Sequence, residues 1–271
     1  MYADLHMHST FSDGTDTPQE LCNLAGAHNI RVISITDHDT VSGQKALRDE
    51  QTPPQIRVIP GIEVSTLVNH KMIHILGYYI DMFSKELERY ICETSEEKTK
   101  STRANFEKAC ADGIFSFRWE RVLELNEGQP RISGAQVIKA MKIDEYEAPG
   151  IGLWDIFHKC FWPENDDYIS YGSFNGYDAI DIIKSIGGIP VIAHPKNIRD
   201  DSVVIDLIRY GAQGLEVYHP VHDREDSKKY LQMAEDNGLY ISGGSDWHGK
   251  NKNEGVPFGS VGLDHGDYKL L

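Results

Sequence analysis

The chain has 271 residues, of which 27 are Lys or Arg and 42 are Asp or Glu, so its formal net charge is −15. A chain of this length buries roughly 75% of its unfolded surface, which allows one large domain or a domain with an insertion. The 13 Tyr, 9 Phe and 4 Trp exclude disorder as the main state, because these side chains need a core in which to pack. No run of about 18 apolar residues is present, so the sequence predicts no membrane span.

The acidic charge balance argues against non-specific binding to duplex nucleic acid, which depends on many contacts between Lys or Arg and phosphate. It does not exclude a small anionic substrate if metal ions sit in the site. The N-terminus carries Asp4, His6 and His8 where a signal peptide would need an apolar segment, and the four cysteines form no CxxC pair. These features predict a cytoplasmic protein with reduced thiols.

Strand and helix signals alternate over the first 80 residues. Residues 2–8 read as a strand, and Thr17-Pro18-Gln19-Glu20 is a capping box with proline at the first helical position, which predicts a helix over 18–29. The β-branched run 31–36 predicts a buried strand. A helix is expected at 41–50. Extended segments are expected at 57–59, 62–66 and 72–80.

The pattern changes after residue 80 and alternation resumes near residue 177. Residues 83–174 predict a mainly helical insertion. Beyond it, helices are expected at 177–186, 202–210 and 223–237, with strands at 189–193, 214–218 and 239–242. Strands separated by helices favour parallel βα units, which in a barrel gather their chemistry at the C-terminal strand ends. We therefore expect one α/β domain from 1–82 and 175–271, and an insertion or cap domain over 83–174.

Six imidazoles and three carboxylates lie mostly at or just beyond the C-terminal ends of these strands. They are His6, His8, Asp13, His38, Glu63, His74, His194, Asp246 and His248. Such a cluster is costly to bury unless it is compensated, and divalent metal ions are the simplest compensation. Imidazole and carboxylate suit Zn, Mn or Fe, and the absence of Cys disfavours a structural zinc site. Nine ligands are too many for one ion and fit two or three, with a bridging carboxylate.

Five short motifs resemble, in the same order, those of the PHP (polymerase and histidinol phosphatase) family. They are His6-Met7-His8-Ser9 with Asp13-Gly14, Ile35-Thr36-Asp37-His38-Asp39, Pro60-Gly61-Ile62-Glu63, Ala193-His194-Pro195 and Gly244-Ser245-Asp246-Trp247-His248. The resemblance implies a distorted (β/α)7 TIM-like barrel, the PHP fold, with a di- or trinuclear metal centre that hydrolyses phosphate esters.

The same resemblance sorts the ligands into three groups. One ion would be held by His6, His8, Glu63 and Asp246. A second would share Glu63 and add His74 and His194. The third would be held by Asp13, His38 and His248.

The insertion resembles the small nucleotide-phosphatase branch of that family. Gly128-Gln129-Pro130-Arg131-Ile132 looks like the short signature of this branch, which usually has a basic residue where Gln129 stands and often His where Arg131 stands. Outside the metal set, the predicted substrate contacts are Arg131, Lys196 and His222. Lys196 follows a predicted strand end, where a phosphate would favour a cation.

The sequence therefore predicts a metal-dependent phosphoesterase in which a metal-bound hydroxide attacks phosphorus in line. Asp13, His38 and His222 are the predicted catalytic residues, and either His222 or metal-bound water protonates the leaving group. The expected substrate is a small phosphorylated metabolite, such as a nucleotide mono- or bisphosphate. Alternatives are a metal-dependent amidohydrolase, a histidinol-phosphate-type phosphatase and a non-catalytic binding module.

Overall fold

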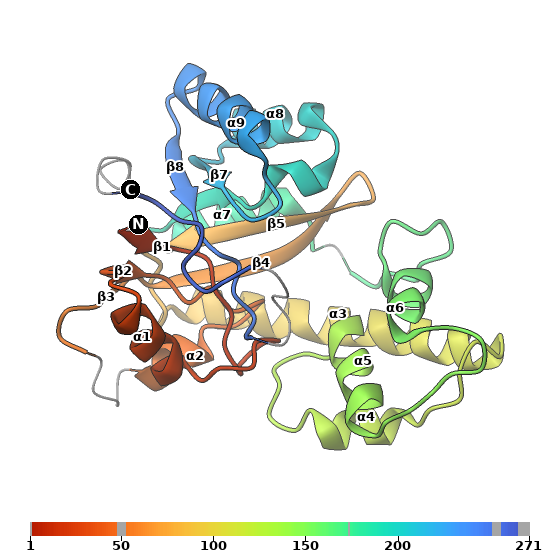
Figure 1. The fold of residues 1–271 in the computed structure, drawn as a ribbon. Helices are drawn as coiled ribbons and strands as arrows, with labels where there is room; N and C mark the ends of the chain where they lie inside the picture. The colour runs from red at the N-terminus through yellow and green to blue at the C-terminus, as the bar shows by residue number, and fades with distance from the viewer. Residues whose placement is uncertain (1, 48–52, 173, 251–255, 265–271) are drawn as a thin grey trace. The chain divides into compact units, whose positions relative to one another are not determined.

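The described strands form two sheets (Figure 1). The computed structural model describes residues 2–47, 53–172, 174–250 and 256–264. A parallel three-stranded sheet holds β1 (Ala3–Asp4), β2 (Val32–Ile33) and β3 (Arg57–Val58). A five-stranded sheet holds, in this order, β4 (Gly61–Val68), β5 (Lys71–Tyr78), β6 (Ile189–Ile192), β7 (Gly214–Tyr218) and β8 (Tyr240–Gly243).

One strand departs from the expected parallel βα pattern. β6, β7 and β8 are parallel, but β5 pairs antiparallel with β6. The cause is the two-residue connection between β4 and β5, in which Asn69 and His70 have φ of 51° and 62°. Two consecutive positive φ values are typical of a tight hairpin turn, so β5 returns along β4 without a crossover helix.

The first two strands are shorter than predicted. The segment after β1 bonds to more than one neighbour: the Leu5 N–H donates to Gly243 O, the His8 N–H to Trp247 O, and Met7 O accepts from Thr36 N–H. These contacts replace a continuous ladder with single bonds. Further isolated parallel bridges join Met7 to Trp247 and His38 to Glu63. Among the described residues the result is a mixed α/β fold with linked sheets, and no single closed barrel sheet is formed.

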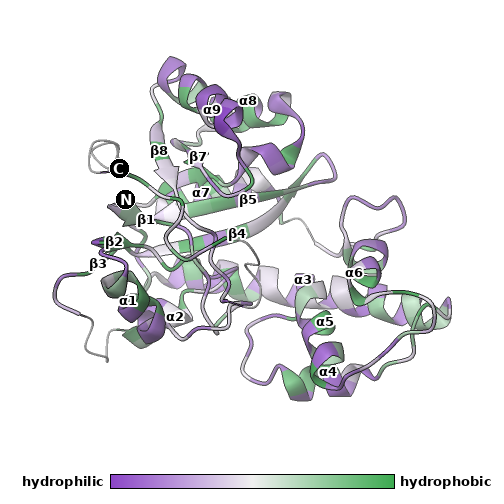
Figure 2. Cartoon of the chain, in the orientation of Figure 1, coloured by the Kyte–Doolittle hydropathy of each residue, from purple (hydrophilic) through white to green (hydrophobic). Residues whose placement is uncertain are grey.

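The helices that accompany these strands begin and end close to their predicted limits. Thr17 and Glu20 form the predicted capping box at the start of the first of them. The last of them buries only Tyr230 and Ala234 and is largely hydrophilic in Figure 2. Residues 48–50 of the helix predicted at 41–50 lie outside the described residues. In chain order the helices are α1 (Pro18–Ala27), α2 (Ser42–Leu47), α7 (Gly176–Ser185), the 3-10 turn η1 (Pro195–Ile198), α8 (Asp201–Tyr210) and α9 (Arg224–Asp236).

The chain divides into two compact units. The first unit contains 1–68, 73–88 and 175–271, and the second contains 69–72 and 89–174. The boundary between 88 and 89 falls inside the long helix α3 (Lys85–Ala111), and the turn between β4 and β5 belongs to the second unit.

Each unit buries its own apolar side chains. In the first unit, Met7, Leu21, Ile33 and Trp247 belong to one buried cluster, so residues next to the predicted ligands help form the core. The second unit packs α3, α4 (Trp119–Leu125), α5 (Gly134–Ile143) and α6 (Leu153–Phe161) around a separate apolar cluster. No helix in the described part of the chain is long and apolar enough to span a membrane.

Candidate metal centre

The structure brings together all nine residues that the sequence selects as metal ligands, and all nine belong to the first unit. They come from segments far apart in the chain, and most of them lie in the loops that follow strands. Glu63 and His74 lie inside β4 and β5, whereas Asp13 lies in the loop before α1.

Glu63 lies at the centre of this group. Its side chain is only 1% exposed, and five imidazoles face its two carboxylate oxygens. Burial alone would raise the pKa of Glu63, but His38, His6 and His74 outweigh it and hold this pKa well below its ordinary value. Oε2 lies 3.3 Å from His6 Nε2, 3.2 Å from His8 Nε2 and 3.0 Å from His38 Nδ1, and Oε1 lies 2.9 Å from His74 Nδ1 and 3.2 Å from His194 Nε2.

Asp246 is the second carboxylate at the centre. Its Oδ1 lies 3.3 Å from His6 Nε2, 3.1 Å from His8 Nε2 and 3.6 Å from His248 Nδ1. Asp246 has a φ of 48°, a left-handed conformation that non-glycine residues rarely adopt. His194, at the end of β6, is also left-handed, with a φ of 27°. Such strained backbone at strand ends is typical of functional sites, where the surrounding structure holds it in place.

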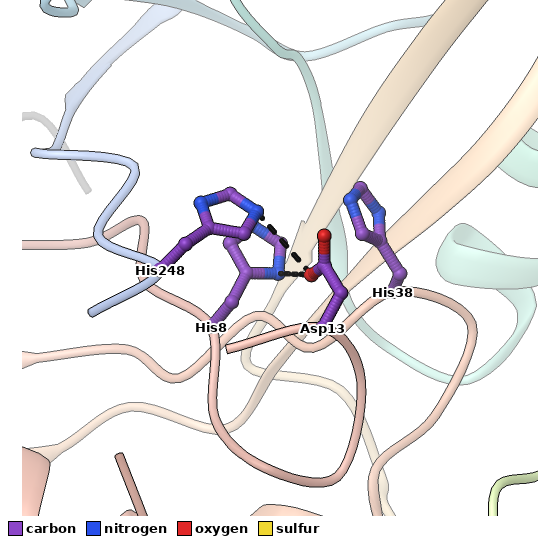
Figure 3. Close-up of side chains that lie close together, drawn as sticks. All are labelled: His8, Asp13, His38 and His248. Atoms are coloured by element: carbon purple, nitrogen blue, oxygen red, sulfur yellow. Dashed lines mark ion pairs between the residues drawn. The ribbon is translucent and has the colours of Figure 1, made fainter. Parts of the chain in front are cut away.

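Asp13 organises a neighbouring cluster with three imidazoles, drawn in Figure 3. Its Oδ1 lies 3.3 Å from His248 Nε2 and 3.8 Å from His8 Nδ1. The rings of His8 and His248 stack with centroids 4.1 Å apart. His8, Asp13, His38 and His248 place one potential ligand atom each within 4.8 Å of one another, so they could hold a cation together.

The loop before α1 is fixed by a buried carboxylate that is not part of the nine. Asp37 accepts hydrogen bonds from the Ser9 N–H and hydroxyl and from the Ser12 hydroxyl. Asp37 thereby orients the segment that carries His8 and Asp13. Burial raises the pKa of Asp37, although these hydrogen bonds oppose the shift.

A second buried carboxylate, Asp4, fixes the segment that precedes Asp246 in the same way. Its carboxylate accepts from the Ser245 N–H at 2.9 Å and from the Ser245 hydroxyl at 2.6 Å. Burial raises the pKa of Asp4 to about 6, against the lowering effect of those bonds. The pair ties β1 to the segment just before Asp246.

Two residues that are not among the predicted site residues, one in β7 and one just after it, also join the site. Glu216 is fully buried and contacts His6 and the backbone of His194. His219 lies 3.3 Å from Asp246 Oδ2 through its Nε2. The available signal for Glu216 is a single carboxylate between Leu215 and Val217 in an otherwise apolar strand, where an unpaired charge would be costly.

The three predicted substrate contacts are in different surroundings. His222 lies beside His219, with ring centroids 5.6 Å apart, and its Nδ1 bonds to Val217 O at 2.9 Å. Since a carbonyl oxygen only accepts, Nδ1 carries the hydrogen and the buried Nε2 is left without a hydrogen bond among the described residues. Burial lowers the pKa of His222.

Lys196 is already paired. Its ammonium binds the carboxylate of Asp226 and lies 3.6 Å from Asp223 Oδ2, so a phosphate would have to compete with both. Arg131 belongs to the second unit, where it is half-buried and near enough to Tyr168 to influence it electrostatically.

The donor set fits divalent cations. Several buried ring and carboxylate atoms make no hydrogen bond among the described residues, including His6 Nε2, both ring nitrogens of His8 and Glu63 Oε2. These atoms face one another in buried ion pairs, and a shared cation would compensate for the cost of their burial. The sets that could share one ion overlap and differ from the expected partition, because His38 groups with Glu63 and His74 as well as with Asp13.

Known proteins share this architecture. Residues 4–133 match the family model of the PHP domain. The chain is 28% identical over 257 residues to a phosphoribosyl 1,2-cyclic phosphate 1,2-diphosphodiesterase of Eggerthella lenta, a match that covers 92% of this chain and 95% of the relative. It is 29% identical to a 3′,5′-nucleoside bisphosphate phosphatase of Chromobacterium violaceum, over 90% of this chain and 86% of the relative.

A solved structure of a phosphoesterase has a similar fold. The crystal structure of a protein from Bifidobacterium adolescentis, named as a metal-dependent phosphoesterase, superimposes with a TM-score of 0.82 and 26% identity. The superposition covers 99% of this chain and 94% of the other. Residues 4–133 therefore correspond to a PHP domain, and the similarity of the whole chain to phosphatases and metal-dependent phosphoesterases identifies it as a hydrolase of phosphate esters.

Proposed function

We propose that this protein removes phosphate from a small phosphorylated metabolite, and that a nucleotide mono- or bisphosphate is its substrate. The observation that carries the proposal is the convergence of imidazoles and carboxylates on Glu63. The similarity to a nucleoside bisphosphate phosphatase and to a cyclic phosphate diphosphodiesterase supports a small substrate. The net charge of −15 also disfavours a long polyanion.

The proposed cofactors are two or three divalent ions of Mn, Fe or Zn. Glu63 would be the shared carboxylate ligand, because five imidazoles face it, and Asp246 would join His6 and His8 at one ion. The remaining ligands would be His6, His8, Asp13, His38, His74, His194 and His248. When bound, such ions activate water and neutralise the charge that develops on the phosphoryl oxygens. Burial lowers the pKa of His8, but its close contacts with the carboxylates of Asp246 and Glu63 outweigh burial and raise this pKa to about 10, so metal binding there would release a proton.

The side chains around the metal set would complete the substrate site. Asp13 and His38 would be catalytic residues through the ion that they hold. His222 would accept a hydrogen bond from the substrate through Nε2. Lys196 would bind phosphate only if its ammonium first left the carboxylate of Asp226. Arg131 would supply a cation from the second unit.

We also propose a barrel architecture for the first unit. The two linked sheets would together form the (β/α)7 TIM-like barrel of the PHP fold, and residues 83–174 would form the insertion or cap domain. The pairings of His38 with Glu63 and of Met7 with Trp247 support the first part, since they join the two sheets through parallel bridges.

Phosphate release measured on a panel of phosphomonoesters tests the proposal. The panel contains nucleoside mono- and bisphosphates, histidinol phosphate and a 5′-phosphorylated oligoribonucleotide, with added Mn²⁺ and with a chelated control. Release of the amine from an amide substrate is measured beside it. We expect metal-dependent release from small nucleotides and its loss in Asp246→Ala. Asp206→Ala, which removes an exposed carboxylate of α8, is the matched control. Turnover of the amide alone, or equal activity in Asp246→Ala, would contradict the proposal.

A further inference from the structure

Glu216 divides its two carboxylate oxygens between two different segments of the candidate metal centre. Oε1 lies 2.9 Å from His6 Nδ1, and Oε2 accepts the His194 backbone N–H at 2.7 Å. Glu216 and His6 are both completely buried, so water does not compete for either bond. β7 thus connects the strand that begins the chain with the strand end that carries His194.

The chemistry of these two bonds determines where His6 carries its hydrogen. Glu216 Oε2 accepts the His194 backbone N–H and Oε1 faces the His6 ring, so both oxygens of the side chain are used as acceptors, as they are in a carboxylate. His6 Nδ1 therefore bears hydrogen. In a neutral ring the lone pair is then on Nε2, and Nε2 is the atom that lies 3.3 Å from both Glu63 Oε2 and Asp246 Oδ1.

A different role for Glu216 must be weighed, because Glu216, His6 and His219 are close enough to hold one cation themselves. His6 cannot donate Nδ1–H to Glu216 and also bind a cation through Nδ1. His219 is engaged as well: its Nδ1 accepts the Val221 N–H at 3.1 Å, so its Nε2 bears the hydrogen and faces Asp246 Oδ2 at 3.3 Å. These hydrogen bonds favour a role in which Glu216 orients the metal ligands and does not bind an ion itself.

We propose that Glu216 is a positioning residue that fixes the Nδ1–H tautomer of His6 and the backbone of His194, so that both imidazoles present Nε2 to the ions. The inference rests on the metal site of the proposed function. Carboxylates behind metal-binding histidines orient the ring and raise its basicity, and their loss commonly weakens metal binding by about 10–100-fold.

Glu216→Gln is the most informative variant. A glutamine side chain has one accepting oxygen, and its amide group would meet an N–H donor at the other position, so it cannot satisfy both His6 and His194. We expect unchanged Zn²⁺ stoichiometry at saturation and roughly 10–100-fold weaker Zn²⁺ affinity. Glu235→Gln, which removes the same charge from an exposed position of α9, should bind Zn²⁺ as the wild type does.

Nuclear magnetic resonance of ¹⁵N-histidine-labelled protein supplies a second measurement that needs no Glu216 variant. His6→Gln assigns the His6 signals. In wild-type protein we expect a protected Nδ1–H proton on His6, both without metal and with Zn²⁺ bound through Nε2. This measurement decides the question even if Glu216→Gln does not fold.

The outcomes separate the possibilities. One ion fewer in Glu216→Gln, or a Zn²⁺-loaded His6 without Nδ1–H, would overturn the inference in favour of direct ligation. Unchanged affinity in Glu216→Gln would overturn it as well. A wild-type chain that binds no divalent ion would contradict the proposed function instead, and the Nδ1–H signal of the metal-free protein would still test the hydrogen bond to Glu216.

Discussion

His38 and Glu63 are joined both through their backbones and through their side chains. The two residues form an isolated parallel bridge, and His38 Nδ1 lies 3.0 Å from Glu63 Oε2. The next residue, Asp39, donates its N–H to Glu63 O at 2.9 Å. Because the main chain aligns the two side chains, the position of the central carboxylate is set by strand pairing and does not depend on a flexible loop.

Glu63→Gln should therefore affect the centre more than any other single change. The variant keeps the size of the side chain but removes the charge that five imidazoles face. We expect fewer ions per chain and a loss of phosphatase activity of at least about 10–100-fold. Metal analysis and steady-state kinetics measure both. Glu86→Gln, on the exposed surface of α3, is the control, and wild-type metal content with full activity in Glu63→Gln would contradict the bridging role.

Arg131→Ala should leave the metal content unchanged and weaken substrate binding. If its guanidinium makes charge-assisted hydrogen bonds to phosphate, the loss is about 1.5–3 kcal/mol, or roughly 10–150-fold in kcat/KM. The effect should appear mainly in KM if the contact is equal in the ground and transition states. Lys142→Ala, at an exposed position of α5, is the matched control, and thermal unfolding checks that Arg131→Ala is folded. Unchanged kinetics in Arg131→Ala would remove this residue from the substrate site.

Gly244→Ala should distort the site through the backbone of His6. A Cβ at Gly244 would lie 2.4 Å from His6 N and 2.5 Å from His6 Cβ, closer than packed atoms allow. We expect overpacking to destabilise the fold by about 1–3 kcal/mol and to weaken metal binding. In Gly26→Ala, by contrast, the new Cβ meets only Gln55 Nε2 at 3.4 Å, and removing glycine from α1 should stabilise it by roughly 0.5–1 kcal/mol. Denaturant unfolding and metal titration of the two variants give the comparison; equal behaviour would refute the close approach.

The capping box of α1 should contribute to stability without affecting the metal site. Thr17→Ala removes the hydroxyl that accepts the Glu20 N–H at 3.2 Å, and should cost about 1 kcal/mol of unfolding free energy. Denaturant unfolding of the metal-free protein measures this loss, and Gln19→Ala is a neighbouring control. A Thr17→Ala protein as stable as the wild type would show that the cap contributes nothing.

The same box gives a pH dependence. Hydrogen bonds from the Thr17 N–H and hydroxyl lower the pKa of Glu20 in the folded protein. The stability difference between the wild type and Glu20→Gln should therefore be fully present above the unfolded pKa of Glu20 and close as the pH falls through the lower folded value. Unfolding curves of both proteins over that acidic range measure it, and a difference that widens on acidification would contradict the sign.

The sequence predicts those parts of the site that follow local rules. His6 and His8 are two apart in an extended segment, and Asp246 and His248 repeat that spacing, so their side chains can meet on one side. Glu216 escapes such reasoning because a lone carboxylate in an apolar strand has no motif. Its role depends on His6, 210 positions away, which only the fold brings near.

The hairpin shows the same limit for the fold. Asn69-His70 lacks the glycine that usually marks a two-residue turn, so the reversal of β5 is not evident before the positive φ values are seen. The pairing of Lys196 with Asp226 likewise depends on η1 and α9 meeting in space.

The bridge between Met7 and Trp247 also has a consequence for biosynthesis. His6 and His8 are synthesised early, whereas Asp246 and His248 are added only after some 240 further residues. Contacts of such large sequence separation form late and slowly. A nascent chain that has not yet reached Asp246 therefore holds its early imidazoles without their second central carboxylate. Metal capture at full affinity thus requires that the segment of Asp246 and His248 has been synthesised, however well the first strands have already folded.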